Sequence, residues 1–193
     1  MLLPAGLAAV FPAVNEDREQ LMELLLAFSK LSLISLFGIS AAMKAKDLAP
    51  LVSHLTLTLP LSRPFARVLA SATVVMELLA VVALLIFPFL GFVVSLLLLV
   101  GFTAHLSRVL ASGVTTSCAC AGSSESTVSA IHLLRNAILI VVAVAGITSL
   151  AFQPDPSAVM QLMLAGPAVL FGAGMLRLDE MTTFFSPRYS RSS

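Results

Sequence analysis

The sequence predicts an all-α fold: a polytopic helix bundle embedded in a membrane. Of the 193 residues, 59% are hydrophobic and only 11% are charged, whereas about a quarter of the residues in a soluble domain are charged. The mean hydropathy is +1.03. A soluble chain of this size still needs a polar surface over its core, and this chain lacks the residues to build one. A lipid bilayer is therefore the first partner that the sequence predicts.

Five apolar runs are long enough to cross a bilayer, which takes about 20 residues of α-helix. They cover residues 21–43, 66–87, 89–110, 130–152 and 158–178. In the loop after the first run, Pro50, Pro60 and Pro64 break any long helix. The alternation of apolar and polar residues over 54–61 is typical of a segment that lies along the membrane interface. A very short turn at Pro88 and Gly91 follows the second run, and a polar loop of small residues follows the third. The segment QPDPS ends the fourth run, and Gly166-Pro167 predicts a kink or partial insertion in the fifth.

We interpret residues 21–178 as a single transmembrane domain. Residues 1–20 are expected to form an N-terminal lead-in, because the segment MLLPAGLAAVFPAV is apolar but lacks the basic start of a signal peptide. Residues 179–193 form a polar C-terminal tail. The formal net charge is +1 and no long basic run occurs, so no nucleic-acid partner is expected.

The distribution of basic residues predicts an orientation. Alternating spans place nine of the eleven lysines and arginines on one side: Lys44, Lys46, Arg63, Arg67, Arg108, Arg135, Arg177, Arg188 and Arg191. The other side has Arg18 within the acidic segment NEDRE. The positive-inside rule makes the first side cytoplasmic. The same alternation assigns all three histidines, His54, His105 and His132, to that basic side together with the two cysteines.

Cys118 and Cys120, the only cysteines, lie in the polar loop between the third and fourth runs. Cysteines two residues apart can close a tight, strained ring, which favours an exchanging disulfide over a structural one. The loop leads into a helix N-terminus, and the helix dipole with His132 or Arg135 nearby would favour the thiolate. Two alternatives remain: the cysteines are incidental small residues, or they bind zinc or copper(I) with one or two histidines. No second cysteine pair completes a metal set.

Two ionisable residues fall inside the apolar runs. Counted from the outer ends of their helices, Lys30 and Glu77 lie at similar depths of about 14–15 Å, so the two could meet as a buried pair. A buried charge is costly unless it is paired or protonated. One interpretation is a proton or quinone-headgroup site, which makes a quinone a possible cofactor; the other is a pin between two helices.

The segment SCACAGSSESTVSAIHLLRN resembles the C-x-C and Arg-Asn signature of the MauE family of methylamine utilisation, within the wider MauE/DoxX group of redox-associated membrane proteins. The segment MKAKD, Leu59-Pro60 and the glutamate before Leu78-Leu79 also resemble that family. The resemblance implies a four-helix DoxX-like core, here with a fifth transmembrane helix. Carried over residue by residue, it points to the following: Cys118, Cys120, Gly122, Arg135, Asn136 and Glu77. Ala121 departs from the family pattern, which has phenylalanine there.

The resemblance implies a thiol–disulfide redox protein of the cell membrane that assists disulfide formation or maturation of a partner. The partner would be a thioredoxin-like protein or an exported protein such as the methylamine dehydrogenase small subunit. His132, Arg135, Asn136, Gly122 and His105 would support the cysteines. An exported substrate suggests cysteines on the outer side, whereas the charge distribution places them inside. The alternatives are a non-catalytic assembly factor or anchor subunit, and a small transporter built around Lys30 and Glu77.

Overall fold

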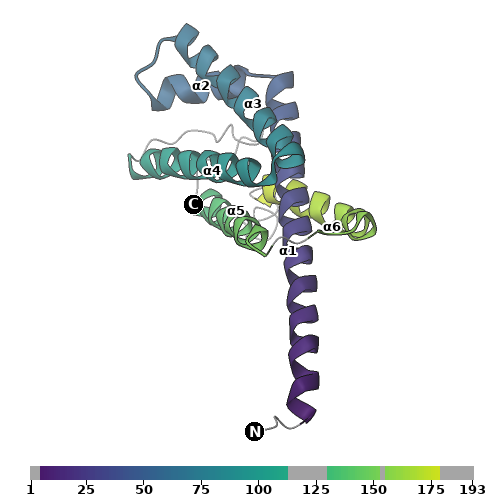
Figure 1. The fold of residues 1–193 in the computed structure, drawn as a ribbon. Coiled ribbons are helices and arrows are strands. Elements are labelled where there is room, and N and C mark those ends of the chain that lie inside the picture. The colour runs from purple at the N-terminus through teal and green to yellow at the C-terminus, as the bar shows by residue number, and fades with distance from the viewer. Residues whose placement is uncertain (1–4, 113–129, 153–154, 179–193) are drawn as a thin grey trace, which may run out of the picture.

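The computed structural model describes residues 5–112, 130–152 and 155–178, and this part of the chain is helical almost throughout (Figure 1). Its elements, in order, are α1 (Ala5–Lys46), α2 (Ala49–Thr58), α3 (Arg63–Ile86), α4 (Pro88–Ala111), α5 (Ala130–Leu150) and α6 (Ala158–Leu176). No strand occurs among the described residues. The prediction of an all-α fold is confirmed.

Five of the described helices are long and apolar enough to cross a membrane. They are the Glu16–Lys46 part of α1, α3, α4, the Ile131–Leu150 part of α5, and α6. Large apolar side chains on their outer faces are exposed, among them Val68, Leu85, Phe89, Leu97 and Leu162. So large an apolar surface is unfavourable in water and suits a lipid environment. The chain is a multi-pass membrane protein, as predicted.

Two prolines of the first loop lie at helix starts, and the loop contains only the short helix α2, as the expectation that they exclude a long helix requires. Pro50 lies in the first turn of α2, and Pro64 lies in the first turn of α3. The missing N–H group is not needed in a first turn, and the fixed φ angle suits a helix start. The short helix α2 extends into residues 54–61, the segment expected to lie along the interface, and ends there at Thr58. The first helix also starts earlier than expected, at Ala5, within the segment interpreted as a lead-in.

Helix α1 is at the centre of the bundle and packs against α3, α5 and α6, while α4 packs against α3 and α5 (Figure 1). The main hydrophobic core lies between these helices and comprises Leu26, Leu33, Leu36, Phe37, Ala80, Leu84, Phe92, Leu99, Leu139, Ala143 and Leu176. A second, smaller core joins α2 to α3 through Leu51, Val52, Leu55, Ala66 and Ala70. The four helices α1, α3, α4 and α5 thus form a common core, and α6 lies against α1.

Small residues allow two close helix contacts. A Cβ atom on Gly91 would lie 2.3 Å from the backbone nitrogen of Leu84, so α3 and α4 approach closely beside their short turn. A Cβ atom on Gly146 would lie 2.2 Å from the ring of Phe92, which is fully buried. Close backbone approach at small residues is the usual way that helices pack in lipid.

The contact between α1 and α6 has the same character. A Cβ atom on Gly172 would lie 2.2 Å from the hydroxyl of Ser35 and 3.0 Å from the backbone nitrogen of Leu36. Ser35 Oγ donates to the carbonyl oxygen of Ala168 at 3.2 Å, which links the two helices. Helix α6 is continuous across Pro167, and its 19 residues span about 28 Å, close to the thickness of the hydrocarbon layer.

Candidate functional site: a buried polar cluster

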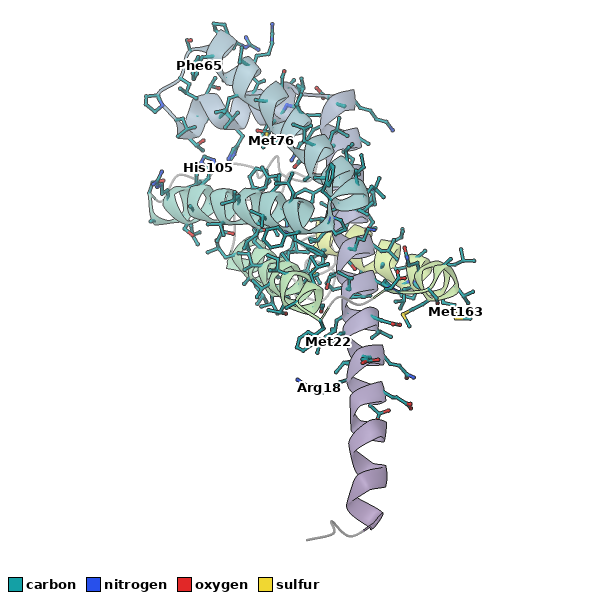
Figure 2. The ribbon with its side chains drawn as sticks, viewed as in Figure 1. Arg18, Met22, Phe65, Met76, His105 and Met163 are labelled. Carbon is teal, nitrogen blue, oxygen red and sulfur yellow. The ribbon has the colours of Figure 1, made fainter. Side chains whose placement is uncertain are left out.

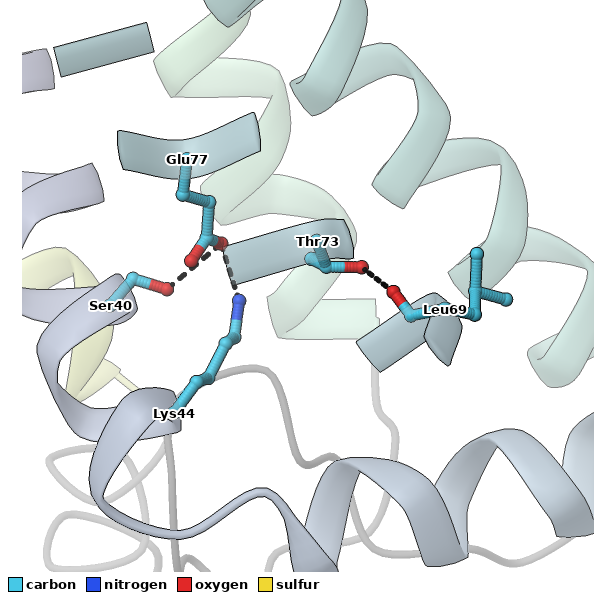
Figure 3. Close-up of polar contacts among 5 residues, drawn as sticks. All are labelled: Ser40, Lys44, Leu69, Thr73 and Glu77. Carbon is cyan, nitrogen blue, oxygen red and sulfur yellow. Dashed lines mark hydrogen bonds and ion pairs between the residues drawn. The ribbon is translucent and has the colours of Figure 1, made fainter. Parts of the chain in front are cut away.

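The most buried ionisable group among the described residues is Glu77, which is 1% exposed and lies on α3. The Lys44 ammonium on α1 donates to Glu77 Oε1, and Lys44 is only 4% exposed. Ser40 Oγ donates to the same oxygen at 3.1 Å. Figure 3 shows both side chains of α1 pointing at the carboxylate. The charges are thus paired inside the bundle, as a low-dielectric environment requires.

Helix periodicity explains why these side chains converge. Phe37, Ser40 and Lys44 are spaced by three and four residues, so they lie on one face of α1. Val74, Glu77 and Ala80 likewise lie on the buried face of α3. Because α1 and α3 pack together, Ser40 and Lys44 on the face of α1 meet Glu77 on the face of α3.

The expected pairing of Glu77 with Lys30 is wrong, because the ion pair recorded for Glu77 joins it to Lys44. Lys30 is partly buried and lies fourteen residues earlier on α1, about 21 Å along the helix axis. Depths counted along two helices can be compared only if the helices are nearly parallel. Helix α3 runs obliquely across α1, so equal counts from the helix ends do not bring residues together (Figure 1).

A small cavity of about 30 Å³ adjoins the ion pair. Five helices, α1, α3, α4, α5 and α6, line it. The lining residues are Leu36, Phe37, Ser40, Lys44, Glu77, Leu99, Phe102, Arg135, Asn136, Leu139 and Leu176. A cavity needs about 10–15 Å³ to hold one water molecule, whereas benzene occupies an engineered cavity of about 150 Å³. The volume therefore suits one or two water molecules and is smaller than the cavity that benzene occupies.

Three polar atoms among the described residues remain without a hydrogen-bond partner at this cavity. They are Glu77 Oε2, Arg135 Nε and Asn136 Nδ2, from residues that are 1%, 6% and 2% exposed. Buried polar atoms are normally satisfied, and ordered water is a common partner. A water molecule in the cavity would accept from the two nitrogen atoms or donate to the carboxylate oxygen. The sequence-predicted residues Glu77, Arg135 and Asn136 thus lie together.

The cluster also includes an aromatic ring that the sequence analysis did not single out. Lys44 Nζ lies 5.2 Å from the centroid of the Phe102 ring on α4, within the range of a cation–π interaction. Ser40 and Phe102 were missed, and Lys44 was considered only as part of the MKAKD segment and of the basic side. The signal that could have found Lys44 is its spacing from Phe37 and Ser40 on the buried face of α1.

The histidines occupy two places. His54 Nε2 on α2 and His105 Nε2 on α4 are 3.2 Å apart, and their rings meet edge to face. One nitrogen must carry the shared proton and the other must accept it. This contact bears out the assignment of both residues to one side of the membrane. His132 lies on α5 and is 3% exposed.

Arg18 contacts the end of α5 that lies away from the histidines. Its guanidinium lies 5.6 Å from the centroid of the Phe152 ring, just beyond α5. Figure 2 shows Arg18 beside the lower part of α1 and His105 well away from it, between α2 and α4. Alternating spans predict this separation.

Cys118, Cys120 and Gly122 lie outside the described residues, in the connection between α4 and α5. Arg135 and Asn136 are in the second turn of α5, the helix that follows this connection. Within residues 5–112, 130–152 and 155–178, no group of three or more His, Cys, Asp or Glu side chains could hold a metal ion.

Comparison with known protein families identifies the relatives of this chain. The family model described as methylamine utilisation protein MauE matches residues 22–149, about two thirds of the chain. The chain belongs to the MauE family. The MauE match includes the whole polar cluster and all three histidines, and it ends before α6 begins. No curated protein and no solved structure matches the chain.

Proposed function

We propose that this MauE-family protein is a thiol–disulfide redox protein of the cell membrane, in which Cys118 and Cys120 exchange disulfides with a partner. The partner would be a thioredoxin-like protein or an exported protein such as the methylamine dehydrogenase small subunit. The observation that carries the proposal is the buried polar cluster around Glu77. It occupies the core that the family shares, and Arg135 and Asn136 join it from the helix that follows the cysteines.

The charge of the cluster supports thiolate chemistry. Lys44 and Arg135 are formally positive and Glu77 is formally negative, so the cluster has a net charge of +1. The N-terminus of α5 adds a partial positive charge on the side of the preceding connection. A positive environment favours the thiolate, which is the species that attacks a disulfide. The cluster would also hold in place the start of α5, the helix that follows the cysteines in the sequence.

The proposed exchange needs no further reactant. A thiolate of the reduced partner attacks the Cys118–Cys120 disulfide, which breaks that bond and forms a mixed disulfide with one of the two cysteines. The second thiol of the partner then attacks the mixed disulfide. The partner leaves with a disulfide, Cys118 and Cys120 remain as thiols, and the two protons move from the partner to this pair.

The cavity beside Glu77 would serve this chemistry by holding water. Its volume of about 30 Å³ fits one or two water molecules. Glu77, Lys44 and such a water molecule could then accept or return a proton during exchange. This role would distinguish the cluster from a simple pin between α1 and α3.

The test is to trap the thiols of the full-length protein in cells with acid and to count them with a mass-shifting maleimide. We expect reduced and oxidised forms of the Cys118–Cys120 pair, and their ratio should change when the partner protein is deleted. Cys118→Ser or Cys120→Ser should trap a mixed disulfide through the remaining cysteine. Ser112→Ala, at the end of α4 in the same connection, is the matched control.

A membrane-impermeant maleimide adds the side of the membrane to the same experiment. Labelling of intact cells after mild reduction would place the pair outside, as an exported substrate requires. Labelling only after the membrane is opened would place it in the cytoplasm, as the basic residues predict. A pair that never changes redox state, with full function in both serine variants, would overturn the proposal in favour of an assembly factor or anchor subunit.

A further inference from the structure

A second cavity lies away from the polar cluster, where α2 approaches the start of α3. Its volume is about 250 Å³, and it is lined by Leu48, Ala49, Val52, Arg63 and Arg67. The two arginines are four residues apart in the first two turns of α3, so they lie on the same face of the helix. The remaining lining is apolar. The cavity therefore combines two guanidinium groups with a hydrophobic wall.

The position of this cavity corresponds to the edge of the bilayer. Arg63 is the first residue of the span formed by α3, and the neighbouring side chains Phe65 and Val68 are 58% and 65% exposed. Exposed apolar residues beside the first turn indicate contact with lipid at that level. Figure 2 shows Phe65 at the end of the molecule where α2 and α3 meet. A ligand in this cavity would lie at the depth of lipid headgroups.

Ion pairing among the described residues leaves both arginines of the cavity available to a ligand. Within the described parts of the chain, neither Arg63 nor Arg67 forms an ion pair. Asp47, the acidic residue that precedes α2, accepts a hydrogen bond from the backbone nitrogen of Ala49 at 2.9 Å. Two guanidinium groups on one face are suited to a phosphate, because each can donate two parallel hydrogen bonds to its oxygen atoms.

We propose that this cavity binds the phosphate of an anionic membrane phospholipid. Arg63 and Arg67 hold the phosphate, and Leu48 and Val52 contact the apolar part of the lipid next to the headgroup. The charge distribution places this end of the bundle at the cytoplasmic leaflet, whose anionic lipids attract basic sites. A lipid bound here bridges α2 and α3 and so supports the helix that carries His54.

Native mass spectrometry of the full-length protein in detergent, with added phosphatidylglycerol or phosphatidylcholine, tests the proposal. We expect the protein to retain phosphatidylglycerol in preference to phosphatidylcholine. The variant Arg63→Gln/Arg67→Gln should weaken binding of the anionic lipid on the order of tenfold, from the loss of two charge-assisted contacts. The variant Arg108→Gln/Arg177→Gln removes the same charge from the same end of the bundle and should keep the preference.

Three results would overturn the proposal. Equal loss in both double variants would indicate a general charge effect, and equal retention of the two lipids would indicate no preference for a headgroup with a net negative charge. Displacement of the lipid by millimolar inorganic phosphate would indicate a site for a soluble anion. Arg63→Lys/Arg67→Lys keeps the charge and the fold even if the glutamine variant is unstable. It should bind the anionic lipid more weakly than the wild type, because lysine cannot form the paired hydrogen bonds.

Discussion

Lys44 and Glu77 form an ion pair although they occupy very different positions in their helices. Lys44 is two residues from the C-terminal end of α1, whereas Glu77 is fourteen residues from the start of α3. The pair therefore links the end of one span to the middle of the next. Phe102 of α4 and Arg135 of α5 complete the same cluster, so a single polar site joins all four helices of the core.

Removing one member of this pair should destabilise the bundle strongly. Glu77→Met leaves the Lys44 ammonium buried without its acid, and Lys44→Met leaves the carboxylate without its cation. Breaking a buried pair from one side costs about 3–5 kcal/mol, whereas replacing both partners with apolar residues is often neutral. The free energy of unfolding in detergent, measured by denaturant titration, should fall in each single variant and recover in Lys44→Met/Glu77→Met.

Lys46→Met is the control for this cycle, because Lys46 is exposed at the end of the same helix. Its effect should stay within about 0.5 kcal/mol. Additive losses in the double variant would show that the two groups are not coupled. A stable double variant that has lost activity would assign the pair a chemical role beyond pinning α1 to α3.

Gly91 should tolerate no side chain. A Cβ atom there would lie 2.3 Å from the backbone of Leu84, so Gly91→Ala must push α3 and α4 apart. We expect a loss of about 1–3 kcal/mol, larger than the roughly 1 kcal/mol that alanine gains over glycine in a helix. Gly101→Ala on the same helix meets nothing within 4 Å and should be neutral or stabilising. The measurement is the melting temperature of both variants in the same detergent. Equal melting temperatures for Gly91→Ala and Gly101→Ala would contradict the close contact at Gly91.

The contact between His54 and His105 should hold α2 against α4. His105→Phe keeps a ring of similar size and removes the nitrogen that lies 3.2 Å from His54. Hydrogen exchange over residues 49–58 should become faster, while exchange in α3 and α5 stays unchanged. His132→Phe, on α5, is the comparison. Unchanged exchange in α2 would mean that its apolar contacts with α3 are sufficient to hold it.

Arg135 should affect the reactivity of the cysteines if the proposed function is right. Arg135→Gln removes one of the two cations of the cluster, so it should lower the thiolate fraction of the reduced pair and slow its alkylation several-fold. The rate of alkylation by a small maleimide, measured against pH, separates this effect from a general loss of structure. Arg108→Gln, an exposed arginine at the end of α4, should leave the rate unchanged.

Most of the fold could be predicted because lipid makes the requirement simple: each span must be apolar over about 20 residues. The expected runs at residues 66–87 and 89–110 agree with α3 and α4 to within a few residues. Pro50, Pro60 and Pro64 were expected to exclude a long helix from the first loop, which agrees with the structure, but the short helix α2 was not predicted. Proline disrupts the interior of a helix but is well tolerated in its first turn. The position of the helix start must therefore be known before the effect of a proline can be predicted.

The candidate site was predictable in composition but not in pairing. Glu77 was singled out as an ionisable residue inside an apolar run and Arg135 as a cation near the cysteines, and the resemblance to the MauE family added Asn136. The structure brings all three to one cavity. The choice of Lys30 over Lys44 failed because helix tilt cannot be derived from hydropathy. The roles of Cys118 and Cys120 remain predictions, because these residues lie outside the described part of the chain.

The packing of α6 on α1 determines the side of the membrane on which the chain leaves its last helix. A core of four spans returns the chain to the side from which it started. Helix α6 adds a fifth crossing, so the chain ends on the other side. The lack of a side chain at Gly172 allows α6 to pack closely on α1. Counted by alternating spans, the end of α6 at Leu176 lies on the same side of the membrane as the end of α4 and the start of α5, so one set of soluble proteins can reach all three helix ends.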